Sequence, residues 1–105
     1  MSHKFSGDLF NRIPIIGIMR GISKQHAESI APIYYQSGLT TIEVTMNSAG
    51  AEEIIAALVS GYGHKLNIGA GTVCTMDELE RALNAGARFI VAPIVNEEVI
   101  STCVA

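Results

Sequence analysis

The sequence predicts an α/β fold in which short buried strands alternate with helices along one domain of 105 residues. Four apolar runs of strand length are separated by segments whose apolar residues recur at helical spacing. Two stretches, 36–44 and 83–91, share the same order of helix end, glycine, polar step and buried strand. Strands and helices that alternate in this way imply right-handed crossovers and a parallel sheet. We therefore interpret residues 1–105 as a single (βα)₄ segment.

The first unit consists of a strand and a capped helix. Run 13–19 is almost continuously apolar, as expected of a parallel strand that is covered on both faces. Ser23 is suited to be the N-cap of the next helix, and Gly38 is suited to end it. Pro32 lies inside this helix and predicts a kink. A short helix over 6–11 is possible before the first strand.

The other three units follow the same plan. Their strands are predicted at 41–45, 66–71 and 88–92, and their helices begin near Ala51, Thr75 and Asn96. The second helix ends near Gly61 or Gly63 and the third ends at Gly86. Thr75 is followed three residues later by Glu78, which is the spacing of a capping box.

Alternation of polar and apolar residues around the second strand favours one architecture over another. Successive side chains on a strand point to opposite faces, so Glu43, Thr45 and Asn47 share one face. A buried lone carboxylate is costly unless it is paired or used, although a solvated face of an edge strand would also accept it. A small doubly wound sheet would bury Glu43 under helices, whereas a barrel directs it toward a polar axis. We therefore favour the first four βα units of a (β/α)₈ TIM barrel.

Composition excludes several classes of protein. With 49% hydrophobic and 16% charged residues, a net charge of −3 and no run of Lys or Arg, a nucleic-acid surface is not expected. No apolar stretch reaches the ~20 residues that cross a membrane, and the N-terminus has no apolar signal core. Cys74 and Cys103 have the spacing of neither a metal site nor a disulfide framework. We expect a reduced cytoplasmic protein without metal or cofactor.

Candidate functional residues follow the strands, because barrels carry their sites at the carboxyl ends of the strands. Arg20 could grip a carboxylate or phosphate, or it could be an ordinary surface arginine. Gly69 and Gly71 would let a ligand approach the backbone, or let a neighbouring strand pack closely. Thr72 offers a hydroxyl to an anion, and Pro93 follows the last strand. Two unpaired sheet edges would also lead an isolated half barrel to dimerise, rearrange or belong to a longer polypeptide.

Four motifs in register resemble a known family. Segments 13–22, 42–48, 68–73 and 89–93 look like those of the 2-keto-3-deoxy-6-phospho-aldonate aldolases, in order and in spacing. This family includes the phosphogluconate, phosphogalactonate and 4-hydroxy-2-oxoglutarate aldolases. The Arg-Gly-Ile and Asn-Ser endings look more like those of the phosphogalactonate branch.

The resemblance implies a class I, metal-free aldolase on a (β/α)₈ barrel, usually trimeric and cytoplasmic. Its substrate is a 2-keto-3-deoxy-6-phospho sugar acid, cleaved reversibly to pyruvate and glyceraldehyde 3-phosphate through a lysine Schiff base. Glu43 matches the glutamate that shuttles protons. The expected substrate-binding residues are Arg20, Asn47, Thr72 and Pro93.

One departure from the family pattern is large. The family's lysine lies on strand six, whereas the lysines here are Lys4, Lys24 and Lys65, none of which matches it. The chain alone is therefore expected to be inactive. The alternative is a non-catalytic half barrel that serves assembly or binds small anions. A flavodoxin-like signalling module is weaker still, because Arg20 stands where an acidic pair would follow the first strand.

Overall fold

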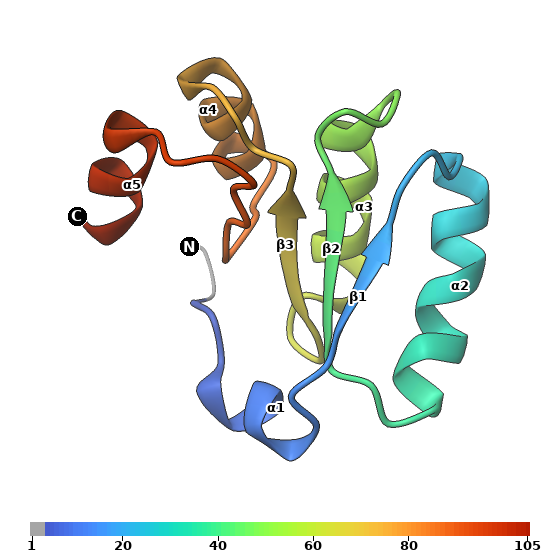
Figure 1. The fold of residues 1–105 in the computed structure, drawn as a ribbon. Helices are drawn as coiled ribbons and strands as arrows, with labels where there is room; N and C mark the ends of the chain where they lie inside the picture. Colours follow the sequence, from blue (N-terminus) through green and yellow to red (C-terminus); the bar gives the residue numbers. More distant parts are fainter. Residues whose placement is uncertain (1–3) are drawn as a thin grey trace.

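The computed structural model describes residues 4–105, so the first three residues of the predicted segment lie outside the described part. Its elements are α1 (Gly7–Arg12), β1 (Ile16–Met19), α2 (Lys24–Gln36), β2 (Thr41–Thr45), α3 (Ala51–Tyr62), β3 (Asn67–Gly71), α4 (Met76–Asn84) and α5 (Glu97–Val104) (Figure 1). The three strands form one parallel sheet in the order β1-β2-β3. The prediction of an α/β fold with a parallel sheet is confirmed.

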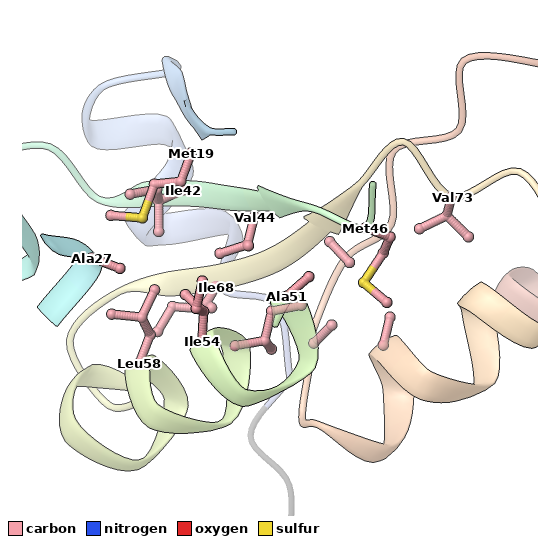
Figure 2. Close-up of a cluster of buried hydrophobic side chains, with 14 of the residues drawn as sticks. Met19, Ala27, Ile42, Val44, Met46, Ala51, Ile54, Leu58, Ile68 and Val73 are labelled. Atoms are coloured by element: carbon pink, nitrogen blue, oxygen red, sulfur yellow. The ribbon is translucent and has the colours of Figure 1, made fainter. Parts of the chain in front are cut away.

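The hydrophobic core lies on one face of this sheet. Ile42 and Val44 of β2 and Ile68 of β3 pack against α3, which contributes Ile54 and Leu58 (Figure 2). Because side chains alternate along a strand, Glu43 lies on the face of β2 that points away from this core. The alternation seen in the sequence therefore separates a helix-covered face from a polar face.

The prediction of a fourth strand over 88–92 is wrong. This segment does run beside β3: the Ala70 amide donates to the Phe89 carbonyl at 3.0 Å, and the Val91 amide donates to the Ala70 carbonyl at 2.9 Å. The pairing amounts to a single bridge between Ala70 and Ile90. Pro93 has no amide hydrogen with which to extend a ladder, and a strand with one neighbour gains fewer hydrogen bonds.

The first strand is shorter than predicted and is not covered on both faces. β1 begins only at Ile16, two residues after Pro14. Ile16 and Ile18 are 38% and 61% exposed, whereas Met19 is buried in the core. The exposed isoleucines are in register with Thr41 and Glu43, so they lie on the face that the core does not cover. The continuous apolar run therefore does not mean two covered faces here.

Helix α1 lies at the amino ends of the strands, below the sheet in Figure 1. The Ser6 amide donates to Asn67 Oδ1 at 2.7 Å, and Asn67 Nδ2 donates to the Ser6 carbonyl at 2.9 Å. The Thr40 hydroxyl donates to the Leu9 carbonyl at 2.5 Å. These contacts confirm the short first helix and attach it to the start of β2 and β3.

The predicted N-cap residues begin helices α2, α4 and α5. Ser23, Thr75 and Asn96 each accept hydrogen bonds from the first turn of the helix that follows, and Thr75 and Glu78 form the predicted capping box. Helix α2 runs without interruption through Pro32. Within residues 4–105, no helix is both long and apolar enough to cross a membrane.

Candidate functional site

The carboxyl ends of the three parallel strands lie at the same edge of the sheet. β1 ends just before Arg20, β2 ends at Thr45 and β3 ends at Gly71. Glu43 is paired in register with Ile18 on one side and Gly69 on the other. The sheet therefore brings the polar face of β2 between the ends of its two neighbours.

Glu43 is the central group of this edge. Glu43 is only 6% exposed. Its carboxylate lies directly over Gly71: a Cβ atom added there would be 1.3 Å from Oε2 and 2.4 Å from Cδ. Glycine at position 71 is what leaves room for the carboxylate. Among residues 4–105, no hydrogen bond involves the Glu43 carboxylate oxygens.

The electrostatic surroundings of Glu43 suit proton transfer. Burial raises the pKa of the Glu43 carboxyl above its usual range, and the positive charge of Arg20 opposes this shift. Desolvation favours the protonated form of an acid, so the group holds a proton more readily than an exposed glutamate does. A carboxyl perturbed in this way at the ends of parallel strands is a candidate general acid and base.

Arg20 and Thr72, both predicted from the sequence, meet at this edge. Arg20 Nη2 donates to Thr72 Oγ1 at 3.3 Å, although the two residues are 52 positions apart. Thr72 has a φ of +54°, in the left-handed region that β-branched residues rarely occupy. Such strain is characteristic of functional sites. The pair places a guanidinium and a hydroxyl on the same side of the strand ends.

Asn47 and Pro93 stand apart from this group. Both are exposed, Asn47 in the turn after β2 and Pro93 after the segment beside β3. In the part of the chain that the structure describes, no hydrogen bond joins either residue to Glu43 or Arg20. Their substrate-binding roles stay predictions.

Sequence reasoning missed residues that organise the site. The Gly21 amide donates to Ser48 Oγ at 2.8 Å, and Ser48 Oγ lies 2.8 Å from Thr45 Oγ1. These contacts join the ends of β1 and β2. Alternation placed Thr45 on the same face as Glu43, but Thr45 was not among the predicted site residues. Ser48 lies in a turn, where no periodicity predicts the direction of its side chain.

Phe89 was also missed as a neighbour of the polar face. A Cβ atom added at Gly69 would be 2.5 Å from its ring, so the ring covers the position beside Glu43. Its ring packs edge-on against Phe5 with centroids 5.7 Å apart. An aromatic cluster therefore covers the amino-terminal part of the face that carries Glu43.

The lysines of the chain lie outside the three strands. Lys4 and Lys24 are exposed, and Lys24 is the first residue of α2. Lys65 precedes β3, and its Nζ lies 5.1 Å from the centroid of the Tyr35 ring. None is part of a strand of the sheet that carries Glu43.

Comparison with known proteins identifies the family to which this site belongs. A family model described as KDPG and KHG aldolase matches residues 8–105. The 2-dehydro-3-deoxy-6-phosphogalactonate aldolase of Escherichia coli K12 is 34% identical over 93 residues, which are 89% of this chain and 45% of that protein. A probable enzyme of the same name from Rhizobium meliloti is 36% identical, over 83% of this chain and 41% of that protein.

Solved structures agree. A structure described as native KDPGal has a TM-score of 0.85 and 31% identity, over 97% of this chain and 48% of that one. KDPG aldolase from Legionella pneumophila, with pyruvate captured as a covalent carbinolamine intermediate, has a TM-score of 0.81 and 27% identity, over 90% of this chain and 46% of that one. The chain thus spans about half the length of the relatives it matches. With a family model that matches nearly all of its residues, the chain belongs to the KDPG and KHG aldolase family.

Proposed function

We propose that the chain forms the first four βα units of a (β/α)₈ barrel in a Schiff-base aldolase and supplies its acid–base group. The reaction is the reversible cleavage of a 2-keto-3-deoxy-6-phospho sugar acid to pyruvate and glyceraldehyde 3-phosphate. The observation that carries the proposal is the buried Glu43 carboxylate, which lies over Gly71 with a raised pKa at the carboxyl ends of the strands. The names of the relatives support the substrate class.

Glu43 has the proton-transfer role. In the direction of condensation, its carboxylate removes a proton from the methyl carbon of lysine-bound pyruvate through a water molecule. In the direction of cleavage, it returns that proton to the same carbon. A pKa raised by burial brings the acid closer to the neutral pH at which both transfers must occur.

The remaining residues hold the substrate in this proposal. Arg20 and Thr72, joined by their hydrogen bond, bind the substrate carboxylate, because a guanidinium pairs with two carboxylate oxygens. Asn47 and Pro93 line the substrate site nearby. The lysine nucleophile comes from sequence beyond this chain. The assembled enzyme is a cytoplasmic homo-oligomer, a trimer, which needs no metal or cofactor.

The exposure of one sheet face supports the barrel. Ile16 and Ile18 are apolar and exposed on the same face as Glu43. In a closed barrel this face points to the axis, where the second set of strands covers it. The position of this face inside the barrel then explains both the polar side chains of β2 and the exposed isoleucines of β1.

Borohydride reduction in the presence of pyruvate is expected to leave the mass of the 105-residue chain unchanged. Lys4 and Lys24 are exposed and Lys65 lies at the amino end of β3, so none contacts Glu43. Mass spectrometry provides the measurement, with the E. coli relative as the positive control. A stable one-pyruvate adduct on this chain would contradict the proposal that its nucleophile lies elsewhere.

A second candidate function is assembly without catalysis, which the exposed Ile16 and Ile18 also favour. Two copies of the chain could cover each other's open sheet face. If so, size-exclusion chromatography and native mass spectrometry should find a defined dimer of 11.2 kDa chains. A monomer at all concentrations would rule out this candidate and leave the aldolase proposal standing.

A further inference from the structure

A second cavity lies at the end of the sheet opposite to Glu43. It has a volume of about 530 Å³ and is formed where α1 meets the start of β3. Asn67, the first residue of β3, lines it, whereas Glu43 lies over Gly71, the last residue of that strand. The cavity is of the size that holds small ligands and belongs to no part of the proposed aldolase site.

Arg88 lines this cavity, and within residues 4–105 two nitrogens of its guanidinium have no hydrogen-bond partner. Its Nη1 donates to the carbonyls of Leu66, at 3.2 Å, and Gly63, which attach the guanidinium to the loop before β3. Its Nε and Nη2 are buried and have no hydrogen-bond partner within the described residues. These two nitrogens form the edge of a guanidinium that receives two oxygens of one anion. A buried donor without a partner is costly, so an anion on this edge would relieve that cost.

The other charges around the cavity favour an anion with two negative charges. Among residues 4–105, its charged lining consists of Lys4, Arg12, Arg88 and one acid, Asp8, and His64 also lines it. Across residues 4–105, no ion pair joins Arg12 or Arg88 to a carboxylate. The three positive charges and one negative charge leave an excess of two. A phosphate group near neutral pH carries close to two negative charges.

We propose that this cavity is a second binding site, for a phosphate group that is either free or carried by a small ester. Arg88 provides the two-pronged contact through Nε and Nη2, and Arg12 and Lys4 provide the further positive charges. Nε and Nη2 are closed to solvent, and a Cβ atom at Gly63 would lie 2.4 Å from Nη2, so binding requires the guanidinium to turn toward the cavity. The site lies at the amino end of β3, whereas Arg20 and Thr72 lie at the carboxyl ends of the strands, so it is separate from the proposed catalytic site.

Titration of the ¹⁵N-labelled chain with inorganic phosphate, and separately with glycerol 3-phosphate, tests this proposal by NMR. Saturable amide shifts are expected at Gly63, His64 and Arg88. Because a charge-assisted hydrogen bond is lost, Arg12→Gln and Arg88→Lys should each weaken binding by about tenfold. Arg12 is exposed and Arg88→Lys keeps the positive charge, so at least the first variant tests binding without a folding defect.

Lys24→Gln is the matched control, since it removes one positive charge from an exposed residue at the start of α2. Its dissociation constant should equal that of the unmodified chain. Binding of either probe with this pattern supports the site, and the tighter probe tells whether the natural ligand is the free ion or an ester. Shifts confined to Arg20 and Thr72, affinities of the Arg12 and Arg88 variants equal to that of the unmodified chain, or no saturation would each overturn the proposal.

Discussion

Replacing Glu43 with glutamine is expected to abolish aldol cleavage while leaving the fold intact. An amide fills the same space but cannot accept and return a proton, and loss of a general acid–base group typically costs 10²–10⁴-fold in rate. The matched region is 45% of the E. coli relative, so the chain should replace that segment of the relative for the measurement. Pyruvate released from 2-dehydro-3-deoxy-6-phosphogalactonate then reports the activity.

Glu53→Gln is the control for this substitution. Glu53 is an exposed residue in the first turn of α3, away from the polar face of β2. The same loss of one negative charge there should leave the cleavage rate unchanged. A Glu43→Gln chimera that is as active as the Glu53→Gln chimera would remove Glu43 from the mechanism.

The same variant has a second, opposite effect on stability. Because burial raises the pKa of Glu43, the folded chain binds this proton more tightly than the unfolded chain does. The ionised carboxylate therefore lowers the free energy of unfolding above the folded-state pKa, and stability returns as the pH falls through it. Glu43→Gln should raise the free energy of unfolding at neutral pH and remove this pH dependence. Denaturant titrations of the 105-residue chain at several pH values measure both.

Alternation along β2 explains why this face could be predicted from the sequence. Ile42 and Val44 pack on α3, and Glu43 points to the other side, as the period of two requires. The first residues of the helices could also be predicted from the sequence, since a cap such as Thr75 with Glu78 is a local feature of a few residues. These predictions depend only on neighbours in sequence.

Predictions that depend on distant neighbours were less successful. The apolar run at the start of the chain suggests a strand with two covered faces, but Ile16 and Ile18 are exposed. The pattern of apolar side chains indicates which residues favour burial. It does not indicate whether the same chain provides the residues that cover them. The shortening of segment 88–92 to one bridge at Ile90 has the same cause.

In the candidate site, too, single residues could be predicted from the sequence, but contacts between distant residues could not. Arg20 and Thr72 were identified separately from their positions after strands, but their contact spans 52 residues and depends on strand register. The close approach of Glu43 to Gly71 likewise crosses from β2 to β3. No pattern along one strand predicts which residue of the next strand lies below a side chain.

Gly71→Ala is the second substitution with a large expected effect. The new Cβ atom would be 1.3 Å from Glu43 Oε2, so the carboxylate must leave its position. We expect cleavage by the chimera to fall as far as in Glu43→Gln. Forcing a methyl group into a packed position typically costs 1–3 kcal/mol of stability. Gly61→Ala is the control, because a Cβ atom at Gly61 in α3 meets nothing within 4 Å and alanine favours a helix by roughly 0.5–1 kcal/mol.

A double-mutant cycle separates a clash with the carboxylate from a general defect in β3. In a Glu43→Ala background the atoms that Gly71→Ala would strike are absent, so the cost of Gly71→Ala in unfolding free energy should largely disappear. The coupling between the two positions is then of the size of the single Gly71→Ala effect. If Gly71→Ala costs the same in both backgrounds, glycine at this position serves the strand itself. In that case the carboxylate of Glu43 has no special place over β3, and the geometry on which the proposed proton transfer depends would be lost.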